Sequence, residues 1–223
     1  MAMRNHYIDN YTHKGERKAL IDYLRNEKNI TDETVLKAME NIPRHFFLDS
    51  AFERHAYQDK AFPIGQGQTI SQPFTVAFQT QLLQVKKHDK ILEVGTGSVY
   101  QATVLAEIGA RVFTIERQKA LYDFQQKAYF FKNKYLNIKF FYGDGFEGLP
   151  TFAPFDKIII TAGAPIIPPK LIQQLKPGGM MVIPVDEGAL QRMYRITKQI
   201  DGTITQEAFD LFSFVPMLEG KNL

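Results

Sequence analysis

Residues 90–185 alternate between short, almost entirely apolar runs and more mixed stretches. The runs KILEV, KIIIT and MMVIPV contain few polar residues, as expected for strands covered on both faces. Alternating strands and helices are typical of a parallel sheet with helices on both sides. The pattern predicts strands at 90–95, 111–116, 138–142, 156–161 and 180–185, and helices near 99–108, 118–134 and 168–175.

The flanking segments have different patterns. Residues 16–56 look helical, with Leu20, Ile21 and Leu24 on one face and Thr31 as the expected N-cap of a second helix. Pro73 suits the first turn of another helix. Beyond residue 190, two alternating stretches flank the hairpin signal Asp201-Gly202, and LFSFVP could add one more strand.

These patterns predict one doubly wound, Rossmann-like α/β domain over residues 1–223, because 223 residues that are 44% hydrophobic suit a single core. The sheet should be mostly parallel and end in antiparallel C-terminal strands. We divide the domain into a helical N-terminal extension (1–60), a loop and helix that contact substrate (61–89), a cofactor-binding core (90–185) and the antiparallel strands (186–223).

Composition narrows the class of protein. No window approaches 18 apolar residues, and the N-terminus lacks the apolar core of a signal peptide, so we expect no membrane association. The absence of cysteine excludes disulfides, thiolate metal sites and cysteine nucleophiles, and it is compatible with a cytoplasmic location. The net charge is +3 and the basic residues are scattered, which argues against nucleic acid as a partner.

A ligand of this fold binds at the carboxyl ends of the strands, where the strand order reverses. The first predicted strand ends in a glycine turn, the second ends in an acid about 20 residues later, and the third ends in GDG. An acid at the second position commonly binds ribose hydroxyls, and no lysine follows the loop as in a triphosphate site. A nucleoside with a small zwitterionic tail, such as S-adenosylmethionine (AdoMet), fits better. The predicted cofactor residues are Glu93, Gly95, Thr96, Gly97, Ser98, Glu116, Asp144 and Gly145.

The order LEVGTG, IE, GDG and LKPGG resembles class I AdoMet-dependent methyltransferases. More specific segments resemble the protein-L-isoaspartate (D-aspartate) O-methyltransferase family. They are IPRHFF (42–47), PIGQGQTISQP (63–73), GTGSVYQA (95–102), GDGFEGLP (143–150), APFDKIIITAGAP (153–165) and QLKPGGMMVIPV (174–185).

The resemblance implies an enzyme of protein repair. It would move a methyl group from AdoMet to the α-carboxylate of L-isoaspartyl and D-aspartyl residues in damaged proteins and peptides, leaving S-adenosyl-L-homocysteine (AdoHcy). We expect it to act as a monomer. The resemblance assigns the active-site role to Ser71, although this serine could simply cap the helix at Pro73. It places Asp59, Gln68, Thr69 and Ile70 at the substrate.

Metal chemistry is not expected. We interpret His45 of IPRHFF as a structural histidine, and His6, His13, His55 and His88 are scattered without metal-ligand spacing. Metal-assisted methyltransferases need clustered acidic and histidine ligands, and amino-group nucleic-acid methyltransferases carry Asn/Asp-Pro-Pro-aromatic where this chain has TAGAPIIPP. Two alternatives remain open: a small-molecule carboxyl methyltransferase and a non-catalytic AdoMet-binding protein.

The chain departs from the family pattern at four positions. The family usually has glycine where Val99 stands, leucine at Phe62, tryptophan at Leu149 and alanine at Gly163. Only Val99 adjoins the cofactor loop. We expect it at negative φ, with its methyl groups toward the ligand, so that AdoMet binds more weakly than it would to Val99→Gly.

Overall fold

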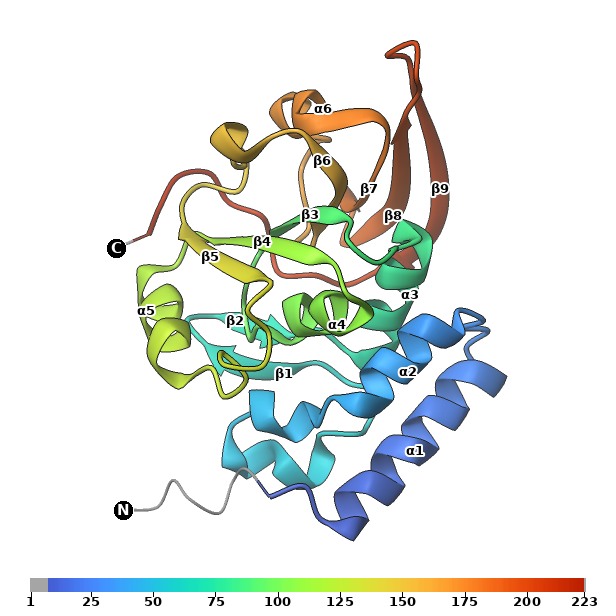
Figure 1. The fold of residues 1–223 in the computed structure, drawn as a ribbon, viewed down its shortest axis with the longest axis vertical. Helices are drawn as coiled ribbons and strands as arrows, with labels where there is room; N and C mark the ends of the chain where they lie inside the picture. Colours follow the sequence, from blue (N-terminus) through green and yellow to red (C-terminus); the bar gives the residue numbers. More distant parts are fainter. Residues whose placement is uncertain (1–7, 223) are drawn as a thin grey trace.

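A seven-stranded sheet forms the centre of the molecule in the computed structural model, which describes residues 8–222 (Figure 1). Its strand order is β5-β4-β3-β6-β7-β8-β9, and every neighbouring pair from β5 to β7 is parallel. The strands β8 and β9 add antiparallel pairs, so the predicted fold class is confirmed. The strands are β3 (Lys90–Val94), β4 (Arg111–Glu116), β5 (Ile138–Tyr142), β6 (Phe155–Ile160), β7 (Leu175–Glu187), β8 (Leu190–Lys198) and β9 (Ile204–Phe212).

Both faces of the parallel strands are buried, as their continuous apolar runs predict. Ile91 of β3 belongs to a cluster shared with helices α3 and α4, whereas its neighbour Leu92 belongs to a cluster on the other face, shared with α6. The strand order reverses between β3 and β6, whose carboxyl ends therefore flank a crevice. The helices are α3 (Pro73–Leu83), α4 (Tyr100–Ile108), α5 (Lys119–Ala128) and α6 (Pro169–Gln174).

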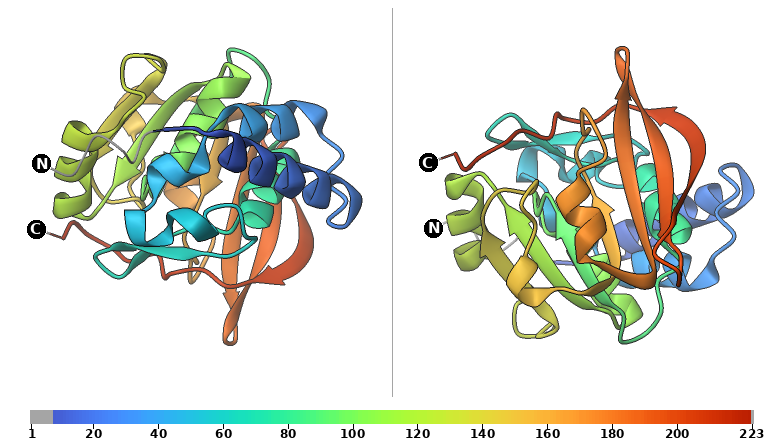
Figure 2. Two further views of the ribbon diagram at one scale, coloured as in Figure 1. Left: turned by 90° about the horizontal axis from the view of Figure 1, so that it is seen from below. Right: turned by 90° about the horizontal axis from the view of Figure 1, so that it is seen from above.

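The N-terminal helices pack beneath α3 and α4 (Figures 1 and 2). Their apolar side chains share one buried cluster with Tyr100 and Val104 of α4, so they extend the main core. These elements are the α-helices α1 (Tyr11–Asn26) and α2 (Glu33–Asn41) and the 3-10 helices η1 (Arg44–Phe47) and η2 (Ser50–His55).

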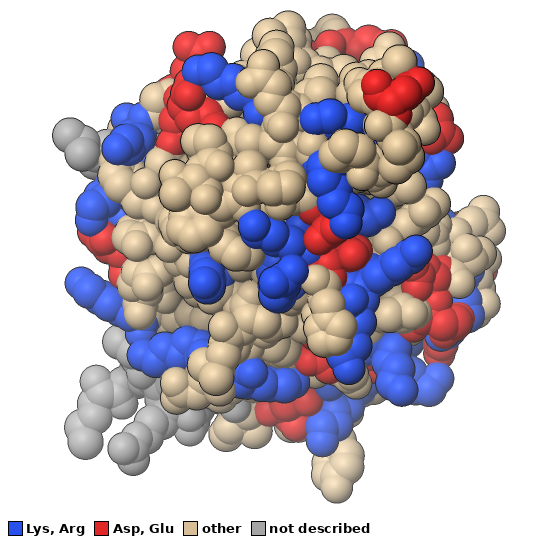
Figure 3. Space-filling view, turned by 45° about the horizontal axis from the view of Figure 1, so that its top comes forward, with Lys and Arg blue, Asp and Glu red and all other residues tan. Residues whose placement is uncertain are grey.

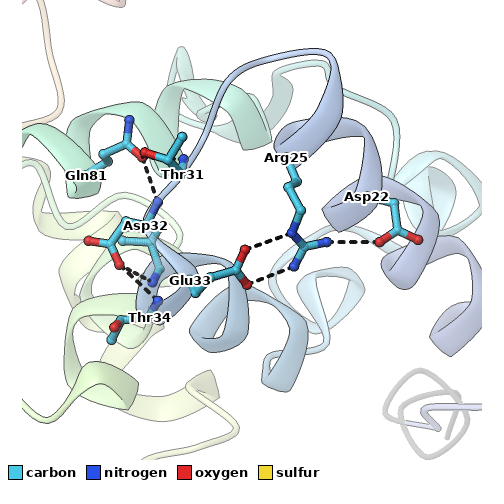
Figure 4. Close-up of polar contacts among 8 residues, drawn as sticks. Asp22, Arg25, Thr31, Asp32, Glu33, Thr34 and Gln81 are labelled. Atoms are coloured by element: carbon cyan, nitrogen blue, oxygen red, sulfur yellow. Dashed lines mark hydrogen bonds and ion pairs between the residues drawn. The ribbon is translucent and has the colours of Figure 1, made fainter.

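The N-cap of α2 differs from the prediction by one residue (Figure 4). Asp32, rather than Thr31, accepts hydrogen bonds from the Thr34 and Val35 amides, at 2.9 and 3.2 Å. The Thr31 amide instead donates to the side-chain oxygen of Gln81 in α3, at 2.7 Å. Thr31 was the wrong choice because α2 begins one residue later than predicted, at Glu33, so that the Asp32 side chain is the one that reaches the free amides of the first turn.

The glutamine- and glycine-rich loop before α3 contains a small antiparallel hairpin. Its strands are β1 (Phe62–Gly65) and β2 (Gln68–Ile70). Pro73, three residues after the end of β2, begins α3, as predicted. The segment PIGQGQTISQP (63–73) is therefore partly a β-hairpin, and Gln68, Thr69 and Ile70 lie on one of its strands.

The C-terminal residues do not add the strand suggested by LFSFVP. The strand β9 ends at Phe212, and the following chain runs back over the strand ends as a strap, which we define as residues 213–222 (Figure 2). Isolated bridges pair Gly163 with Pro216 and Gln118 with Asn222. The strap thus closes one side of the crevice.

Val99 has a left-handed backbone, with φ 71° and ψ 0°, and is the N-cap of α4. Its amide donates to the Thr96 carbonyl at 2.8 Å, which closes a tight turn before the helix. Its side chain is fully buried in the cluster with Leu105 and Val112 and does not line the crevice. The expected negative φ and ligand-facing methyl groups were therefore wrong, because the turn fixes φ and the core takes the side chain. The predicted gain in AdoMet affinity for Val99→Gly loses its basis.

The left-handed backbone predicts an unusual order of stability. Val99→Gly and Val99→Ala both remove the isopropyl group, but only alanine keeps a Cβ at positive φ. We expect the glycine variant to be the more stable of the two by about 1 kcal/mol in chemical denaturation. Ala102 inside α4 provides the control, because Ala102→Gly should destabilise by about 1 kcal/mol. A Val99→Ala protein at least as stable as Val99→Gly would contradict the left-handed conformation.

Candidate active site

A cavity lies at the carboxyl ends of the strands, where the order reverses. Its walls come from β2, the loop after β3, the end of β4, the loop after β6 and the strap. Ten residues predicted for the site line it: Gln68, Thr69, Ile70, Ser71, Gly95, Thr96, Gly97, Ser98, Glu116 and Gly145. The other three predicted residues, Asp59, Glu93 and Asp144, lie behind or beside the wall.

The glycine loop after β3 needs its two glycines for different reasons. Gly95 has φ 97°, and a Cβ there would lie 2.5 Å from the Thr161 hydroxyl oxygen. That hydroxyl donates to the carbonyl oxygens of Gly95, at 2.8 Å, and Val94, at 3.0 Å. The loop after β6 is thus hydrogen-bonded to the glycine loop. Gly97 has φ 49° and donates its amide to Glu116 at 3.0 Å. The loop is held from both neighbouring strand ends.

Glu116 is well placed to bind ribose hydroxyls. Its carboxylate accepts hydrogen bonds from the Gly97 amide and, at 2.9 Å, from the Gln118 amide. Burial raises its pKa above the ordinary value, and these backbone hydrogen bonds oppose the shift. Each carboxylate oxygen has a second lone pair, so Glu116 can hold the loop and accept from a ligand together.

Asp144 ties the strap to the end of β5. Its carboxylate accepts from the Phe146 amide at 2.9 Å and from the Gly220 amide at 2.7 Å. The adjacent Gly145 lines the cavity, and a Cβ there would lie 2.4 Å from Val94. Asp144 therefore acts on the cavity wall through the strap and through Gly145.

Glu93 is fully buried and does not line the cavity. Neither of its carboxylate oxygens has a hydrogen-bond partner among residues 8–222. The nearby hydroxyls of Thr114 and Thr96 are 2.7 Å apart and bond to each other. Burial raises the pKa of Glu93 to about 8, so the side chain is mainly neutral at pH 7. Glu93 therefore lies behind the cavity wall, unlike most of the other predicted cofactor residues.

Ser71 lines the cavity at the end of β2. The N-cap residue of α3 is Gln72, which makes no side-chain cap hydrogen bond, and the Phe74 amide donates to Asp59 at 2.7 Å. Asp59 thus does the capping that was the alternative role for Ser71. A smaller second cavity shares Thr69, Ser71, Thr161 and Val215 with the first.

Several lining residues were not predicted. Tyr100 and Gln101 come from α4, Arg117 and Gln118 follow β4, and Thr161 and Ala162 follow β6. The strap adds Val215, Pro216, Met217 and Leu218. The strand-end rule could have found Thr161, but the strap carries no local sequence signal.

The histidines are less scattered than the sequence suggested. The rings of His13 and His45 lie 3.9 Å apart, and Asp9 is close enough that the three could share a metal ion. However, Arg17 donates to both Asp9 oxygens, at 3.0 and 2.9 Å. His45 is buried, bonds the Tyr57 hydroxyl at 2.7 Å and has its pKa lowered to about 4 by burial. These contacts agree with its structural interpretation, while His6 lies outside the described residues.

The fold and the cavity define a class I AdoMet-dependent methyltransferase. The family model described as Protein-L-isoaspartate(D-aspartate) O-methyltransferase matches residues 15–222. The chain belongs to this family.

Individual relatives agree over nearly the whole length. The chain is 54% identical over 210 residues to the protein-L-isoaspartate O-methyltransferase of Cytophaga hutchinsonii, covering 94% of each. It is 53% identical to that of Flavobacterium johnsoniae, covering 96% of this chain and 99% of the relative.

Solved structures show the same fold. A protein-L-isoaspartate O-methyltransferase superposes with a TM-score of 0.80 at 26% identity, over 90% of this chain and 65% of the other. A structure from Plasmodium falciparum, described as the same kind of enzyme in complex with S-adenosyl-L-homocysteine, gives 0.77 at 25% identity, over 91% and 98%.

The acids around the cavity predict specific losses of cofactor affinity. Glu116→Ala and Asp144→Ala should each weaken AdoMet binding by about 1–3 kcal/mol in calorimetry, because amides and ligand groups are left unpaired. Glu147→Ala is the matched control, since this exposed side chain bonds Lys170 and not the loop or the strap. Unchanged affinity in both cavity variants would mean that the cofactor binds elsewhere.

The neutral, buried Glu93 predicts a pH-dependent effect on folding. In the unfolded chain a glutamate ionises near about pH 4.3, whereas Glu93 in the fold keeps its proton to about pH 8. The native state therefore binds more protons across this range, and stability falls as pH rises through it. Glu93→Gln cannot ionise, so its stability relative to the parent should increase from about pH 5 to about pH 8.5.

Melting temperatures across that range test this expectation, with the exposed Glu147→Gln as control. A Glu93→Gln variant whose relative stability stays level or falls with rising pH would show that Glu93 is ionised and paired in the fold.

Proposed function

We propose that this chain methylates the α-carboxylate of L-isoaspartyl and D-aspartyl residues in damaged polypeptides, with Ser71 as the residue that orients this carboxylate. Membership of the family over residues 15–222 supports the reaction. The observation that carries the role of Ser71 is its place on the cavity wall while Asp59 caps α3 in its stead. The Ser71 hydroxyl does not cap the helix, so it can donate a hydrogen bond to the carboxylate that accepts the methyl group.

The acceptor needs orientation more than activation. A free carboxylate, with an ordinary pKa near about 4, is already ionised at neutral pH and needs no general base. The described residues that line the cavity agree with this, because Arg117 is the one basic side chain among them and no histidine is present. Holding the acceptor in line with the transferred methyl group can supply much of the rate enhancement.

Each wall of the cavity has a role in this proposal. The backbone of Gly95, Thr96, Gly97 and Ser98 would hold the methionine end of AdoMet, Glu116 the ribose, and Gly145 beside Asp144 the adenine. Gln68, Thr69 and Ile70 would shape the channel for the acceptor, whose carboxylate would reach Ser71 in the second cavity.

The reaction balances without another reactant. When bound, AdoMet supplies a methyl group on a positively charged sulfur. A carboxylate oxygen of the acceptor forms the new bond to that methyl, and the sulfur keeps the electron pair of the broken bond, giving AdoHcy and a neutral ester. The nitrogen of the neighbouring backbone amide then attacks the ester carbonyl and expels methanol, and water opens the resulting succinimide partly to normal aspartate without the enzyme.

The left-handed Val99 weakens the case for a non-catalytic AdoMet-binding protein. Glycine is common in the family at this position, and glycine adopts positive φ without strain. Val99 has a positive φ, the conformation that glycine adopts without strain, so valine at this position is compatible with the turn that lines the cavity.

We further propose that the protein is a monomer, that it acts in the cytoplasm and that its binding partner is a polypeptide. On the face shown in Figure 3, acidic side chains lie among the basic ones, without the continuous basic surface that nucleic acid favours. Within residues 8–222 no helix combines the length and apolar character needed to cross a bilayer.

A peptide pair tests the proposed reaction. We expect the purified protein to transfer label from AdoMet to an isoaspartyl peptide and to leave the normal-aspartyl peptide of the same sequence nearly unlabelled. Equal labelling of both peptides would indicate a general carboxyl methyltransferase. Labelling of neither, with AdoMet still bound, would favour the non-catalytic alternative.

A further inference from the structure

Arg44 is a fully buried cation in the IPRHFF motif, to which the proposed reaction gives no role. It lies in η1 and has no exposed surface. A buried arginine is rare unless its charge is paired. Within residues 8–222, however, its hydrogen bonds go to backbone carbonyls and none goes to a carboxylate. Burying a charge without a carboxylate partner costs free energy of folding, so we looked for a role of Arg44 other than stability.

These carbonyls belong to residues on either side of the β1–β2 hairpin, which leads to the active site. Arg44 donates from Nε to Ala56 at 3.0 Å, and from Nη2 to Lys60 at 3.4 Å and to Ser71 at 2.8 Å. The strongest of these by distance is the bond to Ser71, the residue proposed to orient the acceptor. The guanidinium therefore fixes the backbone on both sides of the β1–β2 hairpin.

The same guanidinium also lies over the aromatic ring of Tyr100, on the cofactor side of the cavity. Its central carbon lies 4.9 Å from the ring centroid of Tyr100, a distance typical of a cation–π contact. Tyr100 is the first residue of α4, directly after the glycine loop, and it lines the cavity. One side chain thus joins the wall that would hold the acceptor to the wall that would hold the methyl donor.

We propose that Arg44 is a positioning residue, which holds the Ser71 backbone against the start of α4 so that the Ser71 hydroxyl faces the methyl donor. This inference rests on the proposed function of Ser71. In-line transfer is sensitive to placement, and a shift of about 1 Å can cost about 100-fold in rate. Arg44 acts through Ser71 and does not line the cavity itself.

Lysine could not replace arginine here. The guanidinium donates three hydrogen bonds in directions fixed by its planar fork and lies over the Tyr100 ring at the same time, whereas an ammonium group is a compact point charge without that fork. Burial lowers the pKa of Arg44 to about 10, so the group keeps its charge at neutral pH. Arg44→Lys therefore keeps charge and approximate length while it removes the geometry.

A double-mutant cycle tests the inference. The parent, Arg44→Lys, Ser71→Ala and the double variant are compared for kcat and KM with an isoaspartyl peptide, and for AdoMet affinity by calorimetry. We expect Arg44→Lys to lower kcat about 10- to 100-fold, with AdoMet affinity within about twofold. In the Ser71→Ala background the same change should cost about threefold or less, because the hydroxyl that it displaces is already absent.

Arg17→Lys is the matched control. Arg17 is also buried and also donates to groups of the N-terminal part, Asp9 and Tyr57, and within residues 8–222 none of its hydrogen bonds goes to a residue of the cavity wall. Its replacement should lower the melting temperature and leave kcat within about twofold. If Arg44→Lys does not fold at the assay temperature, Arg44→Gln enters the same cycle, since a neutral side chain is easier to bury.

The outcomes separate cleanly. An equal fall in kcat in both Ser71 backgrounds, or a loss of AdoMet affinity that matches the loss of rate, would overturn the positioning role. Failure of the parent to methylate any isoaspartyl peptide would instead refute the proposed function, whatever the cycle shows.

Discussion

The backbone of the loop between β3 and α4 is the constraint on which the site depends. Gly95, Gly97 and Val99 alternate with their neighbours in left-handed conformations, with φ of 97°, 49° and 71°. The chain thereby leaves the sheet, turns tightly and enters α4. Thr161 and Glu116 hold this loop from the neighbouring strands β6 and β4. These hydrogen bonds fix the loop between β3 and α4, and the fixed loop forms one wall of the cavity in the crevice.

The walls of this cavity come from segments far apart in the sequence, and buried polar contacts join them. Asp144 fastens the strap across the strand ends through the Gly220 amide. Arg44 joins the segment before α3 to the start of α4. Such contacts leave little freedom between donor and acceptor walls, which suits a reaction whose chemistry needs placement and no proton transfer. The N-terminal helices support the start of α4 through the core that they share with it.

The sequence predicted most of the sheet and the cofactor loop, because apolar runs and glycine turns are local signals. It failed where a distant contact decides the local structure. The N-cap of α2 is Asp32 rather than Thr31, in a segment whose backbone Gln81 of α3 holds at both residues. The turn to Thr96 holds Val99 at positive φ, and the core accepts its side chain. The strap could not be found from its own residues, since its place depends on Asp144 and the end of β4. The pairing of His13 with His45 likewise depends on the packing of α1 against η1.

The central claim is that Ser71 orients an acceptor carboxylate beside the cofactor. A crystal structure of the chain with AdoHcy and an isoaspartyl peptide tests it most directly. Our account predicts the peptide carboxylate in the cavity shared by Thr69, Ser71 and Thr161, within about 3 Å of the Ser71 hydroxyl and facing the sulfur. A peptide bound with its carboxylate away from Ser71, or a Ser71 hydroxyl turned to the amides of α3, would contradict it.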